Sequence, residues 1–391
     1  MTCFLSKITG TVPSGCLFLR RVFRKNRPVG GLWILLFACF PAAGAGEDGP
    51  PIVGAIRWDA WYGQDGPVCS VEKSLGPPKY HFRLPWFARV TGEETVDIDG
   101  DSREIMDKEI ACAARAGLNY WAFVDYGEGS PMMRAFTRYL DAGDKRGLRF
   151  CFIETGAALD AAKPGDWRRL VEYFKHPDYQ TVLDGRPLLY VFLEPKKIGK
   201  KELQALGDAA VAAGLKRPYL VLMGFNPEHD ARVMEGLGFD AISAYSHTGD
   251  YTMHPKSYAA MCEDIRCERW DKARALGVPC VTFASAGWDT RPRNERPPPW
   301  ITWVGAGQPD QTPPDQQTPL IDVTTATPAQ LSAHLRAALE WTRNNRDLNP
   351  SNAIIIYAWN ENDEGGWLIP TLGAGGVPDE GRIDAAGEAL R

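Results

Sequence analysis

The feature that most constrains the fold is an alternation of short apolar runs with amphipathic stretches, which starts at residue 52 and continues to the end of the chain. The apolar runs are continuous, as in parallel strands that are buried on both faces, rather than alternating with polar residues. Eight of them are predicted to be strands: Ile52–Arg57, Leu118–Val124, Leu148–Ile153, Pro187–Leu193, Tyr219–Met223, Phe239–Ala244, Val278–Phe283 and Ala353–Ala358.

The amphipathic stretches between these runs are predicted to be helices. They are Ser102–Ala116, Ser130–Arg146, Asp166–Lys175, Lys200–Ala213, Glu228–Glu235, Ser257–Leu276, Pro328–Asn345 and Ile383–Leu390. Five of them are followed by a glycine just before the next strand, which is typical of a helix that ends in a left-handed residue. These glycines are Gly117, Gly147, Gly214, Gly238 and Gly277.

Strands that are each followed by a helix predict an α/β fold of the (β/α)8 TIM barrel type, as a single domain. The alternative is an open doubly wound sheet, which would need a glycine-rich turn after the first strand. The first strand instead runs into W-D-A-W-Y at residues 58–62. Two connections are long, residues 63–101 after strand 1 and residues 291–327 after strand 7. Both are expected at the C-terminal face of the barrel, where active sites lie.

The first 45 residues have the pattern of an export signal. They hold six basic residues and no acidic ones, then an apolar run from Gly31 to Phe40, then A-G-A at residues 43–45, which resembles a signal-peptidase site. The apolar run has about 10 residues, whereas a membrane-spanning helix needs about 20. Residues 20–25 (R-R-V-F-R-K) also fit the pattern of a twin-arginine signal.

We therefore expect residues 1–45 to be removed on export to the periplasm or beyond, and residues 46–391 to form the catalytic domain. No stable membrane insertion is expected after the signal is removed. Cys39 could be a lipoprotein acceptor, but Phe37 and Ala38 before it do not fit that pattern, so lipid anchoring is not expected.

Charge separates the export signal from the rest of the chain. Six of the 44 Lys and Arg residues lie in the signal, which leaves 38 against 49 Asp and Glu, a formal charge of −11. Such an acidic domain repels phosphate backbones, which argues against a nucleic-acid partner. The histidines are scattered, no C-x-x-C pair exists and no phosphate-binding loop follows a strand, so neither a metal site nor a cofactor is expected. The sequence indicates no oligomeric state.

The strand ends carry the candidate binding residues, because the C-terminal ends of barrel strands converge on one mouth. The side chains expected there are mostly carboxylates and aromatics: Trp58, Asp59, Tyr62, Asp125, Tyr126, Glu154, Tyr245, Trp288, Arg291, Trp359 and Asn360. Aromatic rings stack on sugar faces, and paired carboxylates can protonate a leaving oxygen and act as base or nucleophile. We expect these side chains to bind an oligo- or polysaccharide.

Three of the charged residues at the strand ends have alternative roles. Asp125 could equally cap a helix, and Arg291 is expected to pair with a carboxylate of the mouth and keep it ionised. Glu194 also ends a predicted strand, but it precedes Pro195 and is expected to be structural.

The strongest candidate catalytic residues are Glu361 and Glu364, in W-N-E-N-D-E-G at residues 359–365. A tight turn after strand 8 would place the two carboxylates side by side, and the repulsion of like charges would raise the pKa of one of them enough to make it an acid. The alternative is an acidic turn that faces solvent. Asp363 is ambiguous, because it either belongs to the site or faces solvent.

These segments resemble a clan that contains glycoside hydrolase family 99 endo-α-mannosidases, family 71 α-1,3-glucanases and WbsX-like proteins. The resemblance covers about residues 52–391 and rests on the W-N-E-x-x-E-G motif, with weaker matches at residues 176–188 and 287–293. It implies a retaining, endo-acting glycosidase on α-linked glycans. In it, Glu361 deprotonates the sugar 2-hydroxyl and Glu364 is the general acid and base. On an α-glucan, displacement by carboxylates would replace that route.

The chain departs from the family pattern at Asn362, where an aromatic is usual, and at Asp363, which adds a third charge. These departures leave open a glycan-binding protein without turnover. The WbsX resemblance leaves open a polysaccharide-modifying glycosyltransferase, although such an enzyme would use cytoplasmic nucleotide sugars and would need no export signal. The reading that we favour is an exported glycoside hydrolase that cleaves an α-mannan-like or α-glucan-like polysaccharide.

Overall fold

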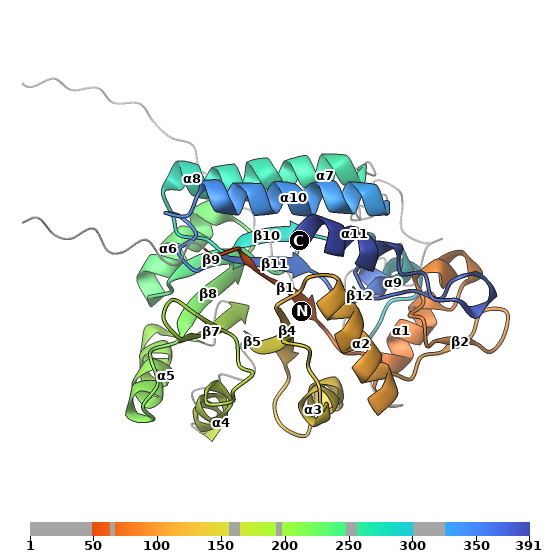
Figure 1. Cartoon of the computed structure of the whole chain (residues 1–391), viewed down its shortest axis with the longest axis horizontal. Helices are drawn as coiled ribbons and strands as arrows, with labels where there is room; N and C mark the ends of the chain where they lie inside the picture. Colours follow the sequence, from red (N-terminus) through yellow and green to blue (C-terminus); the bar gives the residue numbers. More distant parts are fainter. Residues whose placement is uncertain (1–48, 63–66, 156–164, 193–197, 248–255, 300–324) are drawn as a thin grey trace, which may run out of the picture. The chain divides into compact units, whose positions relative to one another are not determined.

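The computed structural model describes residues 49–62, 67–155, 165–192, 198–247, 256–299 and 325–391. Within them, eight parallel strands form a nearly closed barrel with helices around it, which confirms the predicted TIM barrel (Figure 1). The strands are β1 (Ile52–Arg57), β4 (Tyr120–Asp125), β5 (Arg149–Thr155), β7 (Arg186–Phe192), β8 (Tyr219–Gly224), β9 (Ala241–Ala244), β10 (Thr282–Ser285) and β11 (Ala353–Tyr357).

The strands follow the order β10-β11-β1-β4-β5-β7-β8-β9, so β1 lies between the last and the second strand of the barrel. The ring closes between β9 and β10 by a single bridge from Ile242 to Cys280. The Ile242 amide donates to the Pro279 carbonyl across 2.9 Å, and the Val281 amide donates to Ile242 across 2.9 Å. β10 therefore starts later than the predicted Val278, because Pro279 has no amide hydrogen to give to a sheet.

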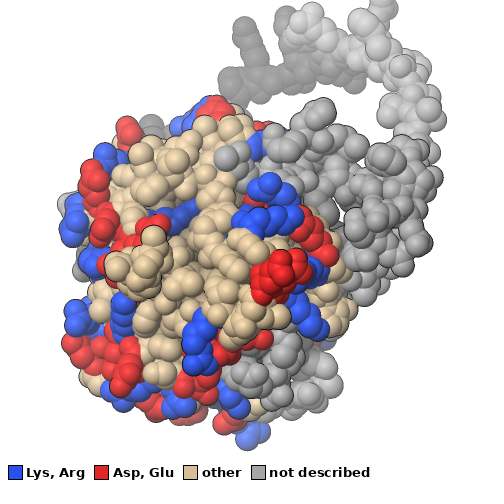
Figure 2. Space-filling model, turned by 90° about the vertical axis from the view of Figure 1, so that its right-hand side faces the viewer, with Lys and Arg blue, Asp and Glu red and all other residues tan. Residues whose placement is uncertain are grey.

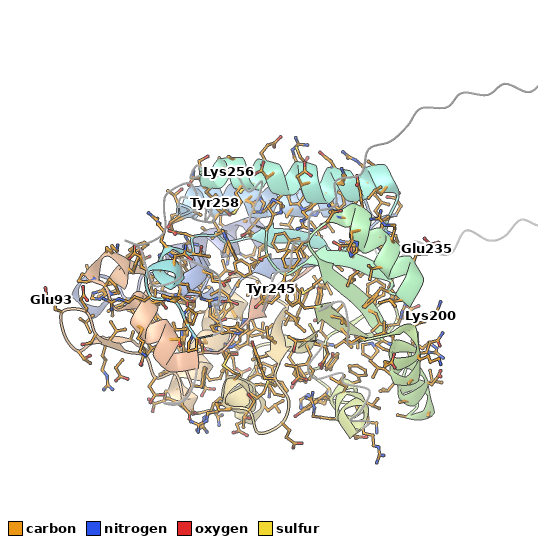
Figure 3. The ribbon with its side chains drawn as sticks, turned by 180° about the vertical axis from the view of Figure 1, so that it is seen from behind. Glu93, Lys200, Glu235, Tyr245, Lys256 and Tyr258 are labelled. Carbon is orange, nitrogen blue, oxygen red and sulfur yellow. The ribbon has the colours of Figure 1, made fainter. Side chains whose placement is uncertain are left out.

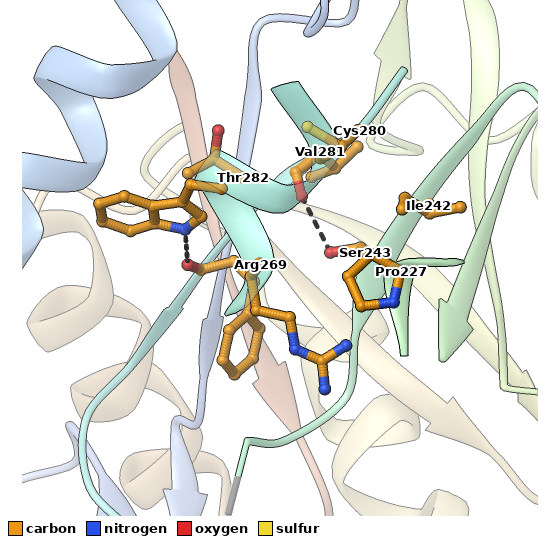
Figure 4. Close-up of a pocket in the computed structure, with 10 residues that line it drawn as sticks. Pro227, Ile242, Ser243, Arg269, Cys280, Val281 and Thr282 are labelled. Atoms are coloured by element: carbon orange, nitrogen blue, oxygen red, sulfur yellow. Dashed lines mark hydrogen bonds between the residues drawn. The ribbon is translucent and has the colours of Figure 1, made fainter. Parts of the chain in front are cut away.

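A small cavity of about 20 Å³ remains where the ring closes (Figure 4). Its lining is held by two hydrogen bonds to strand carbonyls. The Ser243 hydroxyl donates to Val281 across 3.1 Å, and the Trp270 indole donates to Phe283 across 2.8 Å. A space of this size admits about one water molecule, so it completes the packing and is too small for a ligand.

The outer helices follow the predicted alternation. They are α2 (Arg103–Arg115), α3 (Arg134–Asp141), α4 (Gly165–Phe174), α5 (Lys200–Ala212), α6 (Pro227–Leu237), α7 (Tyr258–Ile265), α8 (Lys272–Leu276), α10 (Pro328–Asn344) and α11 (Gly381–Leu390). None of the helices in the described ranges is both long and apolar enough to cross a membrane.

Two predicted helices differ from the observed ones. The helix expected to reach Arg146 starts as a 3-10 turn, η2 (Pro131–Met133), and ends at Asp141, because the chain extends at Ala142 before its turn to Gly147. The stretch 257–276 is α7 and α8 joined by a π-helical segment, η3 (Arg266–Asp271). The five glycines expected after helices all have positive φ, between 63° and 88°, which confirms the predicted left-handed residue after a helix for four of them; Gly147 has this conformation in a turn that follows the end of α3 by several residues.

The long connections carry elements of their own. The loop after β1 folds into α1 (Pro67–Leu75), η1 (Pro78–Arg83) and the ribbon of β2 (Arg89–Val90) and β3 (Val96–Asp97), while the loop after β10 starts with α9 (Arg291–Glu295). After β11 come β12 (Asn360–Glu361), η4 (Asn362–Glu364) and β13 (Gly366–Trp367). In Figure 1 these elements gather on one side, and from that side uncharged residues occupy the middle of the surface (Figure 2).

Candidate active site

The turn after β11 is a tight hairpin in which β12 pairs antiparallel with β13. Gly365 has a φ of 84°, and a Cβ on it would collide with the backbone nitrogen of Asp289, which donates to the Glu364 carbonyl across 2.6 Å. A Cβ on Gly366 would collide with the Tyr357 ring. Two glycines are therefore needed to press this turn against the end of β10.

Glu361 lies at the inner end of the turn, and its side chain is 3% exposed. One carboxylate oxygen accepts a hydrogen bond from the Tyr245 hydroxyl across 2.8 Å, and the other accepts from Nη2 of Arg293 across 3.2 Å. Tyr245 follows β9 and is labelled near the middle of the view in Figure 3. Both oxygens of this buried carboxylate thus accept hydrogen bonds from other segments of the barrel, one from the residue that follows β9 and one from α9.

Glu364 lies nearer to solvent, because its side chain is 17% exposed. Its carboxylate accepts hydrogen bonds from the Tyr357 hydroxyl and from Nη1 of Arg293. Glu361 and Glu364 therefore have the same kind of neighbours, one tyrosine hydroxyl each and one shared guanidinium. They differ in access to solvent.

Arg293, on α9, joins all three carboxylates of the turn. Its Nε and Nη2 donate to Asp363 across 2.6 and 3.0 Å, in addition to its bonds to Glu361 and Glu364. The Arg293 side chain is 7% exposed, and its guanidinium lies 5.0 Å from the centre of the Trp58 ring. Three acidic side chains thus surround one buried cation.

Burial raises the pKa of Glu361 well above its ordinary value, and the charge of Glu364 raises it further, against the opposing effect of Arg293. Burial also raises the pKa of Glu364, although Arg293 and the Tyr357 hydroxyl oppose it. The pair therefore holds a proton at a pH at which an exposed glutamate is ionised, and that proton belongs to the pair rather than to one residue. Burial raises the pKa of Tyr245 and of Tyr357, so both stay protonated donors.

Aromatic rings flank the carboxylate pair from the strands on either side of β11. From β1 and β4, the Trp58 indole donates to the Tyr126 hydroxyl across 2.6 Å, and Tyr126 is 43% exposed. From β9 and β10, the rings of Tyr245 and Trp288 lie 5.9 and 5.6 Å from the ring of Tyr357. Paired carboxyl groups between aromatic side chains are an arrangement suited to acid–base chemistry on a sugar.

The sequence of residues 162–376 matches the family model described as glycosyltransferase WbsX, which is more than half of the chain. The chain belongs to the WbsX family. No curated protein matches it.

Solved structures of a GH99 endo-alpha-mannosidase from Bacteroides thetaiotaomicron have a similar fold to this WbsX-family protein. One is 16% identical, with a TM-score of 0.51, and the match covers 86% of this chain and 96% of that chain. A second, in complex with bis-tris propane, is 17% identical, with a TM-score of 0.54, and covers 87% and 96%. At this identity the likeness establishes the fold.

The structure decides two roles at the mouth of the WbsX-family protein. Asp363, which was ambiguous from the sequence, does not face solvent: it is 2% exposed, because its carboxylate is held by Arg293. Arg291 pairs with a carboxylate of the mouth, as expected; that carboxylate is Asp289, across 2.8 and 2.6 Å, and not Glu361 or Glu364, and against the effect of burial Arg291 helps to keep the pKa of Asp289 below its ordinary value. Two residues correspond to about 200° around a helix, so Arg291 and Arg293 leave α9 in opposite directions.

A hydrogen-bonded group links the end of β1 to the turn after β11. It contains Asp59, Tyr62 and Asn360. The side chain of Asn360 accepts from the Trp58 amide across 2.9 Å and donates to Asp59 across 3.1 Å. Arg57 donates to Asp59 and to the Tyr62 hydroxyl, both across 2.9 Å. All of these side chains are buried, so this group fixes the position of the turn.

Trp359, Asp125 and Glu154 are also buried. Trp359 packs its ring 5.1 Å from that of Trp121, which places it in the core behind the turn. Asp125 accepts from the Gly127 amide across 2.8 Å and from Arg169, so it orders its own turn; the helical turn that follows is capped by Ser130 and not by Asp125. Glu154 pairs with Asp125 in the sheet register, and its carboxylate lies 3.9 Å from Arg169.

The remaining segments from the sequence analysis lie elsewhere or outside the described residues. Residues 181–182 and 186–187 form a hairpin at the start of β7, at the opposite end from the strand ends. Asn362, the departure from the family pattern, is buried and donates to the Arg83 carbonyl across 2.6 Å. Glu194 and residues 1–45 lie outside the described residues.

Arg293 and Tyr357 were not among the predicted site residues. Arg293 lies in the segment 287–293 that carries part of the family resemblance, but nothing in the sequence distinguishes it from Arg291. Tyr357 ends an otherwise aliphatic strand, A-I-I-I-Y, and this polar end is the signal that could have identified it.

Proposed function

We propose that this WbsX-family protein is a glycoside hydrolase that cleaves an α-linked, neutral glycan of the α-mannan or α-glucan type. The observation that carries the proposal is the pair Glu361 and Glu364, each bonded to a tyrosine hydroxyl and to the same guanidinium. The flanking aromatic rings supply faces on which a sugar ring can stack. The net acidic charge of the domain favours a neutral polysaccharide and disfavours nucleic acid.

The proposed chemistry divides the work between the two carboxyl groups. On an α-mannan, Glu361 takes the proton of the sugar 2-hydroxyl, whose oxygen attacks C1 while the bond from C1 to the leaving oxygen breaks. Glu364, which is nearer to solvent, gives its proton to that leaving oxygen. In the second step Glu364 takes a proton from a water molecule whose oxygen attacks C1, the bond from C1 to the 2-oxygen breaks, and Glu361 returns its proton to the 2-oxygen. The raised pKa values of the pair keep one proton available for this cycle.

Export to the periplasm or beyond is a second part of the proposal. It is supported by the basic, apolar and A-G-A segments of residues 1–45. A polysaccharide outside the cytoplasm is a substrate consistent with that location. Fractionation of cells that express the full chain tests this part, since an uncleaved cytoplasmic protein would contradict it.

The decisive experiment is mass-spectrometric product analysis on α-mannans, α-1,3-glucans and polysaccharides that contain fucose or galactose. Wild type, Glu361→Gln and Glu364→Gln are compared, with Glu388→Gln as the control, because Glu388 is exposed on α11 and pairs with Arg336. Each active-site variant should lose about 10²–10⁴-fold in rate with an unchanged fold, and the control should keep its activity. Turnover at the wild-type rate in both variants would refute the proposal.

The family description favours a second function, glycosyl transfer, which the same samples can test. If the purified protein binds a nucleotide sugar and transfers its sugar to an acceptor glycan without hydrolysis, the function is glycosyl transfer and the proposed hydrolase function is wrong. Saturable glycan binding without either reaction at any pH would instead identify a binding protein.

A further inference from the structure

We propose that Arg293 is a positioning residue for Glu361 and Glu364, and that Asp363 fixes its guanidinium. This inference rests on the proposed function, because it gives the two glutamates their catalytic geometry. Arg293 is not assigned a contact with the glycan. It acts through the carboxylates that it holds.

Arg293 uses almost all of its hydrogen-bond donors on the three acids. An arginine has five N–H donors in a rigid fork. Here Nε makes one bond to Asp363, Nη2 makes one to Asp363 and one to Glu361, and Nη1 makes one to Glu364. Four of the five donors are committed to carboxylates, so the orientation of the guanidinium sets the positions of all three acids at once.

Asp363 holds the guanidinium of Arg293 in one orientation. Asp363 binds Nε and Nη2 side by side, across 2.6 and 3.0 Å, which is the two-point contact that orients an arginine best. The Ser74 hydroxyl makes a longer bond of 3.4 Å to the same carboxylate from α1. Because Asp363 lies between the two glutamates in the chain, the turn that carries the pair also carries the anchor of its arginine.

Arg293 also balances the charge of the turn. Three carboxylates in a buried turn would repel one another, and Arg293 supplies the cation that lets them approach. The titratable groups that face this cluster from the other elements are the hydroxyls of Tyr126 on the β4 side, Tyr245 after β9 and Tyr357 of β11. A lysine at position 293 would keep the positive charge but would lack the planar guanidinium, so it cannot bond three acids in this geometry.

The experiment compares Arg293→Lys, Arg293→Ala and Asp363→Asn with wild type, on the polysaccharide of the panel that wild type cleaves. Arg296→Lys is the matched control, because Arg296 follows α9 and pairs with Glu94 at the surface. We expect kcat/KM to fall about 100-fold in Arg293→Lys, mainly through kcat, with a shifted pH profile. Added guanidinium chloride should restore part of the activity of Arg293→Ala and none of that of Glu364→Gln.

The outcomes separate this inference from the proposed function. If Arg293→Lys has the wild-type kcat/KM and pH profile while Glu361→Gln and Glu364→Gln are inactive, the inference is wrong and the function stands. If the glutamine variants keep full activity, the function itself is wrong.

A measurement without substrate covers the case in which no polysaccharide is cleaved. Urea unfolding of wild type and Arg293→Lys is followed between pH 5 and pH 8. The variant should lose more stability than wild type as pH rises, because Glu361 and Glu364 then ionise without the hydrogen bonds of the Arg293 guanidinium. Equal pH dependence in the two proteins would overturn the inference.

Discussion

The hydroxyl of Tyr245 donates a hydrogen bond of 2.8 Å to Glu361, although the two residues are 116 positions apart in the chain. Tyr245 follows β9 and is braced by the ring of Phe192, whose centre lies 5.2 Å away at the end of β7. Tyr357, the last residue of β11, makes the corresponding bond to Glu364. Each carboxyl group of the pair thus has its own tyrosine from a different strand.

The two tyrosines should control different limbs of the pH profile. Each hydroxyl stabilises the ionised form of its partner, so removing it raises the pKa of that carboxyl group. If Glu361 is the base and Glu364 is the acid, Tyr245→Phe should move the acidic limb of the kcat/KM profile to higher pH. Tyr357→Phe should move the basic limb to higher pH. A shift of about one pH unit is expected for one hydrogen bond.

The measurement is kcat/KM against pH for wild type and both variants, with Tyr173→Phe on α4 as a control for the loss of a hydroxyl. Shifts on the opposite limbs would show that the roles of Glu361 and Glu364 are exchanged. Unshifted profiles in both variants would show that the tyrosines do not act on the catalytic pair.

Replacing Gly365 by alanine should destabilise the protein severely. The new methyl group would strike the backbone of Asp289, and the residue would also be held at a φ of 84°. Gly375 is the matched control, because its φ is 65° and no atom lies within 4 Å of an added Cβ. We expect Gly375→Ala to cost about 1–2 kcal/mol and Gly365→Ala clearly more. If urea unfolding shows that Gly365→Ala and Gly375→Ala lose the same free energy of unfolding, this explanation is wrong.

Asp59 should make the protein less stable as pH rises. Burial raises the pKa of Asp59 from 3.8 to about 6, more than Arg57 lowers it. A group whose pKa is raised on folding gives stability that is present below its unfolded pKa and lost as pH rises through the folded one. Wild type should therefore lose up to about 3 kcal/mol from this group between pH 4 and pH 6, at about 1.4 kcal/mol per unit of pKa.

The check is the free energy of unfolding at several pH values for wild type and Asp59→Asn. The variant should have a flatter pH dependence over this range, although Glu361 and Glu364 contribute in the same direction. Asp141→Asn, at an exposed position on α3, should leave the slope as it is. The same slope in Asp59→Asn as in wild type would rule out this role for Asp59.

Substitution of Trp359 should affect mainly stability, and substitution of Trp288 should affect mainly glycan binding. Trp359 is fully buried against Trp121, so Trp359→Ala should cost about 3–5 kcal/mol of stability. Trp288 is half-buried beside Tyr357, and Trp288→Ala should raise KM roughly tenfold with a smaller loss of stability. Thermal unfolding and steady-state kinetics on both variants test this. A raised KM with normal stability in Trp359→Ala would place that ring in the binding site instead.

The barrel could be predicted from the sequence because its signals are local. Runs such as I-I-I at residues 354–356 and left-handed glycines such as Gly238 mark strands and helix ends through burial and backbone conformation alone. The boundary of β10 was less accurate, since Pro279 and Cys280 belong to the apolar run but not to the strand. Pro279, which has no amide hydrogen to give to a sheet, is the local signal that would have placed the start of the strand later.

The sequence by itself determined the alternation of strands and helices and the proximity of Glu361 and Glu364, because strand ends converge in a barrel and three residues span one turn. Only the tertiary structure decided that Arg293 rather than Arg291 joins the pair, and that Asp363 is buried. These outcomes depend on the direction in which α9 presents its side chains to a turn about 70 residues away in sequence. Such contacts between distant segments are set by packing, which local patterns do not encode.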